Sequence, residues 1–474
     1  MTTDDGSGKD AMARAIAASV SAPVPSRAEM ERERLARKRA LQVDGGGGEP
    51  RAKRPTLRFA TGESILTEVP LEEYRGGNGI AFDDLVDAPR LKRAFLTTYI
   101  IDEEWLREKL ASVPDVCIAL HWQAADGDRA GVRRRDQWRI LHPPKPAFSC
   151  MHAKLMLLSY DGFLRVVISS GNLVPVDYGG YEKNIVFVQD FPLRPSSSNA
   201  NNAFYNDLRS FIVALNAPSD VVSEFDRYEF AGAKARIVAS RPGTHARTDP
   251  DYGLRALSRA VKAIGATAPD VSQRLLKLEC STSSLGALTT HWMHDFYKFA
   301  SGLSPTTPSA KGAVNPPPIA VVFPTADTVA SSIQQGGSLF FTRAKYQSPS
   351  FPRGILRDSI SSRCPHSLMH AKVILARRDS DEGPVGWIYH GSHNMSSAAW
   401  GHLLSNGSFK VTNWELGVVV PMERPAASGT RLDGVPVQED VDSVWKRTLP
   451  RYASIIPFVS PAPLYGGKMP FLRS

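Results

Sequence analysis

Two stretches of the sequence each carry a histidine, a lysine two positions later and a more distant asparagine. The six residues are His152, Lys154 and Asn172 in the first stretch and His370, Lys372 and Asn394 in the second. An imidazole, an ammonium and a carboxamide together suit a phosphate ligand, because the ammonium and the carboxamide can donate hydrogen bonds to its oxygens and stabilise charge that develops there. The imidazole then remains available for nucleophilic or acid–base chemistry.

The elements around each stretch predict how these side chains are positioned. The segment AKLMLLSY reads as a strand, and residues two apart on a strand point to the same side, so His152 and Lys154 share a face. The turn signal DG at residues 161–162 lies midway between His152 and Asn172, so a hairpin would bring this asparagine back beside the histidine. In the second stretch the corresponding midpoint is Glu382, inside the turn-like DSDEGP.

The repetition of the pattern predicts a reaction in two steps. Two such groups of His, Lys and Asn side chains, if they face each other, place one imidazole on each side of a phosphorus atom. One imidazole attacks to form a phosphohistidine, while the other protonates the leaving oxygen and then activates water. This chemistry requires no metal, and we expect no cofactor. A single His-x-Lys is a common chance tripeptide, but its recurrence with an asparagine across a hairpin favours function over core packing, which excludes unpaired polar groups.

The composition is that of a soluble globular protein. Of the 474 residues, 42% are hydrophobic and 22% are charged, and no apolar run is long enough to span a bilayer, so we expect no membrane association. The formal net charge of +9 favours an anionic partner such as nucleic acid, although an excess of this size also serves solubility alone. The cysteines have no zinc-site spacing, and we expect reduced thiols in an intracellular protein. They are Cys117, Cys150, Cys280 and Cys364.

The chain is expected to comprise a tail and two domains. Residues 1–56 read as a disordered basic tail, and its clusters RKR at 37–39 and RAKR at 51–54 resemble a bipartite nuclear import signal, although short basic clusters are often only solvated. This pattern predicts a nuclear protein. Further on, short apolar runs alternate with helical patterns, which indicates a layered α/β architecture. The loop SRPGTHARTDPD is the best candidate junction, and we place the two domains at 57–248 and 249–474.

The paired motifs and several shorter segments resemble the tyrosyl-DNA phosphodiesterase family, a branch of the phospholipase D superfamily with paired HKN motifs. The resemblance covers most of the chain from Leu57 onward, and includes FPT at 323–325, GGSL at 336–339, SSAAWG at 396–401 and WELGVVV at 414–420. It implies an α/β fold of two similar phospholipase D-like domains, each a mixed sheet flanked by helices, related by a pseudo-twofold axis, with the active site at their interface. The wider superfamily carries His-x-Lys-x4-Asp, whereas Ser159 and Arg377 stand at the aspartate positions here, which argues against a lipid phospholipase.

The resemblance also implies roles for individual residues. His152 would be the nucleophile, and His370 the general acid that protonates the tyrosine phenolate and then activates water. The phosphate clamp would consist of Lys154, Lys372, Asn172 and Asn394. Glu415, in the matching WELG segment, would orient the imidazole of His370 or His152. Its counterpart in the first half is either Glu182 or Lys183. We favour Glu182, because a carboxylate can accept an imidazole N–H, and a solvated loop acid is the alternative.

Three residues are implied as DNA contacts. Phe148, four positions before the first motif histidine, matches an aromatic that stacks on a base, with packing in the core as the alternative. Ser281 and Ser284, in CSTSSLG, match a loop that binds the DNA backbone, with an ordinary turn as the alternative. Cys280 and Ser283 depart from the family pattern at this loop, where serine and glycine are expected.

By this resemblance the protein would be a monomeric DNA-repair phosphodiesterase that hydrolyses the 3′-phosphotyrosyl bond between DNA and trapped topoisomerase I and leaves a 3′-phosphate. Its partners would be single-stranded or duplex DNA 3′ ends that carry a topoisomerase I peptide or another 3′ adduct. One alternative is a different enzyme of the superfamily, a nuclease or a lipid-directed phospholipase. Another is a non-catalytic DNA-binding scaffold, which is disfavoured because both motif histidines are present.

Overall fold

The structure, a computed structural model, describes residues 56–473 except for 70–78, 123–130, 136–137, 196–201, 269–271, 273–274, 311–314, 365, 381 and 427–439, and for 131–135 it describes the strand alone. The chain divides into two units, Met1–Arg54 and Pro55–Ser474, and all the described residues belong to the second unit. The predicted tail with its basic clusters lies outside the described residues, apart from its last residue. The predicted import signal therefore stays a prediction.

Eight strands form a first mixed sheet in the order β1-β8-β7-β6-β2-β3-β5-β4. These strands are β1 (Glu63–Leu66), β2 (Arg93–Thr98), β3 (Asp115–Leu120), β4 (Gly131–Arg135), β5 (Trp138–His142), β6 (Leu155–Tyr160), β7 (Phe163–Ser169) and β8 (Ile185–Pro192). The pairs β2–β3 and β3–β5 are parallel, and the other neighbours are antiparallel. Strands β6 and β7 are buried along their whole length, in keeping with their almost uninterrupted apolar sequence.

Seven strands form a second mixed sheet in the order β13-β12-β11-β14-β15-β18-β9. They are β9 (Arg236–Ser240), β11 (Leu276–Ser281), β12 (Ile319–Val322), β13 (Leu356–Arg357), β14 (Lys372–Arg378), β15 (Gly386–Gly391) and β18 (Glu415–Met422). A small third sheet joins β10 (Gly243–His245), β17 (Phe409–Val411) and β16 (His402–Leu403). Strand β9 precedes the predicted junction but pairs with β18 in the second sheet. The exact domain boundary stays a prediction.

The two large sheets repeat one arrangement, which confirms the predicted pair of similar α/β halves. In the first, β2 pairs with β3 in parallel and with β6 in antiparallel, and β6 continues into the antiparallel β7 and β8. In the second, β11, β12, β14, β15 and β18 follow the same pattern. Both predicted hairpins are present: Tyr160 pairs with Phe163 around a turn with Gly162 at φ +91°, and Arg377 pairs with Gly386.

Helices connect and cover these strands. They are α3 (Phe82–Val86), α4 (Glu103–Lys109), α5 (Ala203–Ala214), α6 (Ser219–Phe225), α7 (Leu254–Ala263), α8 (Thr290–Ala300), α9 (Ala326–Ala330), α10 (Arg343–Gln347), α11 (Ser397–Trp400) and α12 (Val441–Tyr452), with 3-10 turns at Ala88–Arg90, Pro175–Asp177 and Arg353–Ile355. The Asn202 side chain caps α5 by accepting a hydrogen bond from the Tyr205 amide, and the helix buries apolar residues spaced one turn apart. Within the described residues, no helix is long and apolar enough to cross a membrane.

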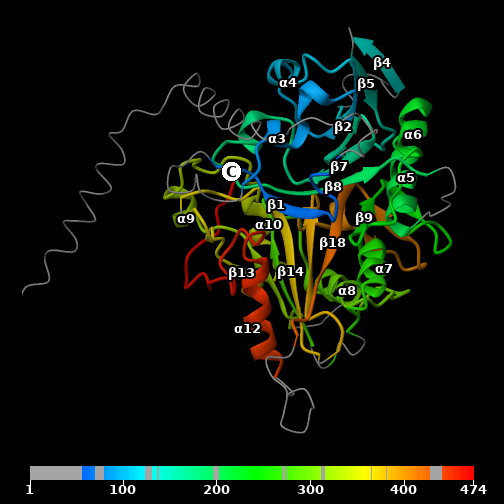
Figure 1. Ribbon diagram of the computed structural model, residues 1–474. Helices are drawn as coiled ribbons and strands as arrows, with labels where there is room; N and C mark the ends of the chain where they lie inside the picture. The colour runs from blue at the N-terminus through cyan, green and yellow to red at the C-terminus, as the bar shows by residue number, and fades with distance from the viewer. Residues whose placement is uncertain are drawn as a thin grey trace, which may run out of the picture. The chain divides into compact units, whose positions relative to one another are not determined.

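The two sheets meet along the strands that follow the motifs. Strands β7 and β8 of the first sheet contact β15 and β18 of the second, and Figure 1 shows β18 next to β7 and β8. Trp414, just before β18, and Leu416 within it are packed among apolar residues of the first half, while Leu66 and Ile185 are packed among residues of the second half. Burial of these side chains stabilises the interface at which the motifs lie, by about 1.5–3 kcal/mol for each large apolar side chain.

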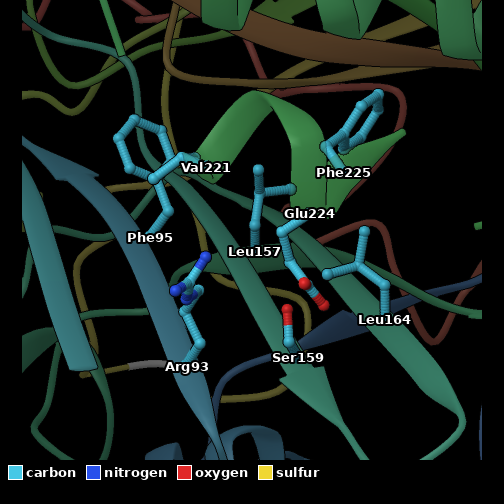
Figure 2. A pocket seen from close by; sticks show the side chains of 8 residues that line it. All are labelled: Arg93, Phe95, Leu157, Ser159, Leu164, Val221, Glu224 and Phe225. Atoms are coloured by element: carbon cyan, nitrogen blue, oxygen red, sulfur yellow. The ribbon is translucent and has the colours of Figure 1, made fainter. Parts of the chain in front are cut away.

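The two positions that the wider superfamily fills with aspartate lie at the ends of β6 and β14 far from the motif lysines. Ser159 lines a small hollow between the first sheet and α6, together with Arg93 and Glu224 (Figure 2). Arg377 forms an ion pair with Asp379 at 3.0 Å. Both positions are therefore engaged in local contacts at the far ends of their strands.

Acid is expected to destabilise the fold through two buried histidines of the second half. His390 in β15 lies 2.8 Å from the Ser64 hydroxyl of β1, and burial lowers its pKa to about 3, while burial lowers the pKa of His393 to about 4. Because both pKa values lie below the unfolded value of about 6.5, their contribution to stability is complete above pH 6.5 and is lost as the pH falls toward 4. Each imidazole should remove about 1.4 kcal/mol per pH unit over that interval.

Urea unfolding at several pH values between 7 and 4.5 measures this effect. The His390→Gln variant should show a shallower pH dependence of the unfolding free energy than the native protein, because one of the two imidazoles is gone. The His366→Gln variant, at an exposed histidine, should keep the native slope. An unfolding free energy that is constant between pH 6.5 and 4.5 would contradict the expectation.

Candidate active site

Each motif histidine is hydrogen-bonded through its backbone to a segment of the other half. The His152 amide donates to the Trp414 carbonyl at 3.0 Å, and the Trp414 amide donates to the Cys150 carbonyl at 2.9 Å. In the equivalent arrangement of the other motif, the His370 amide donates to the Lys183 carbonyl at 2.9 Å. Short parallel bridges, Met151 with Trp414 and Lys183 with Met369, accompany these bonds. The two motifs are therefore fixed at the interface of the halves.

Glu415 contacts His152 and not His370. The distance between the His152 Nδ1 and Glu415 Oε2 atoms is 2.7 Å. Ser392 and Asn413 also donate hydrogen bonds to this buried carboxylate, at 2.5 and 3.2 Å. Burial alone would raise the pKa of Glu415, but the charge and the hydrogen bond of His152 outweigh it and hold the pKa at about 2. The sequence left open which histidine Glu415 orients, and this geometry shows that it is His152.

The electrostatics at His152 suit a nucleophile. Burial lowers the pKa of His152, against the opposing effect of Glu415, so the resting imidazole is neutral near pH 7. With an ionised carboxylate at Nδ1, that nitrogen carries the proton and Nε2 keeps its lone pair. The Tyr99 ring packs against this imidazole in an edge-to-face geometry, with ring centroids 5.4 Å apart.

The partner of His370 differs from the one favoured from the sequence. The His370 Nδ1 atom lies 3.1 Å from the Asn184 Oδ1 atom and 3.8 Å from a carboxylate oxygen of Asp177. The Glu182 carboxylate instead accepts hydrogen bonds from the amide and the hydroxyl of Ser338, at 3.0 and 2.9 Å. Lys183, the other candidate, contributes its backbone to the bridge described above. The expectation that Glu182 is the first-half counterpart of Glu415 is therefore corrected, because Asn184 contacts the imidazole.

The strand register explains why Asn184 takes this place. Trp414 pairs with the residue before His152, and Glu415 follows Trp414 at the start of β18. Lys183 pairs in the same way with the residue before His370, so the residue that follows it, Asn184, is the counterpart of Glu415. Both orienting residues thus stand at the entry of an apolar strand, β18 or β8. An alignment of those two strands would have indicated Asn184.

The motif lysines are buried at the ends of their strands. The Lys154 Nζ atom donates to the His152 carbonyl at 2.7 Å, and Lys372 Nζ donates to the His370 carbonyl. Burial lowers the pKa of Lys154 to about 8, and burial and then the charge of Lys154 hold the pKa of Lys372 well below its usual value. Burial lowers the pKa of His370, and the charges of Lys372, Lys154 and His152 lower it further. Charges of the two halves thus act on one another, as they must in a single site.

The two motif asparagines are held differently. The Asn394 Oδ1 atom accepts hydrogen bonds from the Ser284 amide and the Thr282 hydroxyl, both at 3.0 Å, which leaves the side-chain amide group as a donor. The Asn172 Oδ1 atom is 3.4 Å from the Ile100 amide. Both side chains can therefore present N–H groups to an anion.

The predicted DNA contacts fall in different environments. Phe148 is 98% exposed and adopts a left-handed conformation with φ 63°, so packing in the core is excluded and its ring is free to stack on a ligand. Ser284 is partly exposed and borders Asn394 through its backbone. Ser281 is buried within β11, where it pairs with strands on both sides. Only the first two are placed where a strand of nucleic acid could lie against them.

Asp177, Glu182 and His370 are the one group of side chains in the described part of the chain whose ligand atoms lie close enough to suggest a metal, all within 4.8 Å of one another. Hydrogen bonds already occupy them. Asp177 accepts a hydrogen bond from the backbone N–H of Asn172, Glu182 accepts from Ser338, and His370 contacts Asn184. Each of the three side chains therefore has a hydrogen-bond partner within the protein.

The chain is similar in sequence and in fold to known proteins. A family model described as tyrosyl-DNA phosphodiesterase matches residues 64–466. Tyrosyl-DNA phosphodiesterase 1 of Arabidopsis thaliana is 24% identical over 391 residues, which cover 77% of this chain and 62% of the relative. The protein of the same name from Drosophila melanogaster is 24% identical over 322 residues, 62% of this chain and 54% of the relative. The chain thus spans less than two thirds of the length of these relatives.

A crystal structure of the yeast tyrosyl-DNA phosphodiesterase superposes with a TM-score of 0.63 at 16% identity. The match covers 87% of this chain and 100% of the yeast chain. At this identity the likeness establishes a shared fold of two phospholipase D-like halves.

Proposed function

The chain belongs to the tyrosyl-DNA phosphodiesterase family, and from that premise we propose that it hydrolyses the 3′-phosphotyrosyl bond between DNA and trapped topoisomerase I and leaves a 3′-phosphate. The observation that carries the proposal is the pair of imidazoles from opposite halves, that of His370 buried and that of His152 14% exposed, each held through Nδ1 and each beside a buried lysine. Such a pair suits in-line displacement at one phosphorus atom.

In the first step, the Nε2 atom of His152 attacks phosphorus and the bond from phosphorus to the tyrosine oxygen breaks. His370 gives its proton to that oxygen, so tyrosine leaves as a neutral phenol. In the second step, His370 takes a proton from water, the water oxygen attacks phosphorus, and the bond to His152 breaks. A phenol with a pKa of about 10 is a better leaving group than a sugar hydroxyl, which favours the tyrosyl ester over the DNA backbone.

The clamp residues hold the charge of the phosphate during both steps. We assign this role to Lys154, Lys372, Asn172 and Asn394. Burial removes competing water from the site and strengthens each hydrogen bond to the non-bridging oxygens. The bound phosphate anion in turn raises the pKa of His370, which burial depresses in the free protein, and so supplies the acid that the first step needs.

The DNA strand is proposed to stack a base on Phe148 and to lie along the backbone near Ser284, with other 3′ adducts accepted at the same site. Support comes from the exposed ring and from the formal charge of +9. We further propose that the protein acts as a monomer in the nucleus, a location suggested by the basic clusters of its tail.

Incubation with a 3′-phosphotyrosyl oligonucleotide in EDTA tests the proposed function. The expected products are free tyrosine and an oligonucleotide with a 3′-phosphate, because two imidazoles and two lysines supply the chemistry without a metal. Phosphatidylcholine, tested in parallel, should not be hydrolysed. A reaction that requires added Mg²⁺, or turnover of the lipid alone, would contradict the proposal.

A further inference from the structure

Asp177 is a buried residue next to the site that contacts both Asn172 and Asn184. It is buried, with 2% of its surface exposed, and follows the first motif by five residues in a 3-10 turn. One carboxylate oxygen accepts a hydrogen bond from the backbone N–H of Asn172 at 2.5 Å and lies 3.8 Å from His370 Nδ1. The other accepts from the Asn184 side-chain amide at 3.1 Å. A single carboxylate therefore touches a clamp residue and the partner of the general acid.

The contact with Asp177 decides which way the Asn184 amide points. With its NH₂ group on Asp177, the Asn184 Oδ1 atom faces His370 Nδ1 at 3.1 Å and accepts from the Ser170 hydroxyl at 2.7 Å. The flipped amide would place Oδ1 against the carboxylate, two acceptors facing each other, and would turn its NH₂ group toward His370. The carboxylate therefore excludes the flipped orientation.

The orientation of Asn184 in turn selects the tautomer of His370. An amide oxygen at Nδ1 accepts a hydrogen bond, so Nδ1 carries the ring proton and Nε2 is left to exchange its proton with the substrate. A flipped amide would favour the opposite tautomer, with the lone pair on Nδ1 pointing away from the phosphate. The wrong tautomer disables the imidazole while leaving its position unchanged.

We propose that Asp177 is a positioning residue that acts through Asn184 to fix the tautomer of His370, and that it couples this general acid–base group to the clamp residue Asn172. The inference rests on the proposed function. The two histidines are therefore oriented differently. A carboxylate contacts His152 directly, whereas His370 contacts a neutral amide that is itself hydrogen-bonded to a carboxylate. The interposed amide orients His370 without adding a charge that would keep it protonated, and the second step requires the neutral ring.

The surroundings of Asp177 keep it ionised at the pH of the assay. Burial raises its pKa to about 6, against the hydrogen bond from Asn172, and Glu182 adds to the rise while Lys372 and Lys154 oppose it. Above that pH the group is a carboxylate and can act as the acceptor that the geometry requires. The kinetic tests of this residue should therefore be made at pH 7.5, where the carboxylate is ionised.

The Asp177→Asn variant tests the proposal on two substrates that differ in the leaving group, tyrosine and a more acidic nitrophenol, on the same oligonucleotide. Single-turnover formation of the covalent intermediate should slow by about 10²-fold with tyrosine and by less than about threefold with nitrophenol, which leaves without an acid. KM should change little. Equal slowing with both leaving groups would overturn the proposal, because it would indicate a damaged clamp or fold.

The exchange variant Asp177→Asn/Asn184→Asp guards against a loss of folding, because it keeps the charge and the number of hydrogen bonds. A carboxylate at 184 accepts directly from His370, so intermediate formation from the tyrosyl substrate should recover to within about tenfold of the native rate. Its hydrolysis should stay slow, because the ring remains protonated. No recovery would overturn the proposal.

A control and the native protein separate the possible failures. Asp358→Asn changes another buried aspartate, which accepts hydrogen bonds from Thr325 and Thr328, and should leave both substrates unaffected. If the native protein does not cleave the tyrosyl substrate, the proposed function fails. If it does and the leaving-group difference is absent in Asp177→Asn, only the positioning role fails.

Discussion

Replacing His152 with alanine is expected to lower the rate of cleavage of a 3′-phosphotyrosyl oligonucleotide by about 10⁴-fold or more and to abolish the covalent intermediate. The Nε2 atom of this ring is the only nucleophile that the account provides, and loss of a catalytic nucleophile typically has effects of this size. The clamp would remain, so the variant should still bind the substrate. Denaturing gels that separate DNA-linked protein from free DNA, together with the rate of tyrosine release, measure both parts.

The matched control for this prediction is His294→Ala. His294 is a partly exposed histidine whose ring contacts the Asn315 carbonyl, and its loss should leave the rate within about twofold of the native value. A DNA-linked form of the His152→Ala protein would contradict the assignment of the nucleophile.

Replacing His370 with alanine is expected to have a different result, in which the covalent intermediate accumulates. Without this ring, no group takes the proton from water, so hydrolysis of the phosphohistidine should slow by about 10²- to 10⁴-fold. Formation of the intermediate should slow by a similar factor with tyrosine and much less with nitrophenol. With the nitrophenyl ester we therefore expect a burst of about one equivalent of nitrophenolate per enzyme, followed by a slow steady state.

His366→Ala is the control, since it removes an exposed histidine four positions before His370. It should show no burst and native turnover. A His370→Ala protein that hydrolyses its intermediate as fast as the native protein would contradict the role of this ring. The same result would weaken the argument for Asp177, which is proposed to act only through it.

The fold and the two hairpins that carry the motif residues could be predicted from the sequence because the determining signals are local. The Asp161-Gly162 turn sits midway between His152 and Asn172, and the strands on either side are nearly continuous apolar runs. In a hairpin the turn fixes the register, so the position of this turn signal determines which residues of the two strands pair. The structure contains that hairpin and its counterpart in the second half.

The support behind His370 could not be predicted from the motif alone, because it depends on pairing between residues far apart in the chain. Only an alignment of β18 with β8 would have indicated Asn184. The bridge between Lys183 and Met369 sets the register that brings Asn184 to His370. The loop from the first motif to β8 has no periodicity from which that register could be derived, and a carboxylate seemed the better partner on chemical grounds. Glu182 instead accepts a hydrogen bond from Ser338. The carboxylate near His370 is that of Asp177, and it is hydrogen-bonded to Asn184.

The central claim is that the two imidazoles act on opposite flanks of one phosphorus atom, and the stereochemical course of the reaction tests it most directly. A phosphotyrosyl ester with sulfur in place of one non-bridging oxygen has a stereogenic phosphorus, and hydrolysis in isotopically labelled water gives a product whose configuration can be assigned. Two in-line displacements each invert this centre, so we predict net retention. Net inversion would mean that water attacks the ester directly, and would contradict the account.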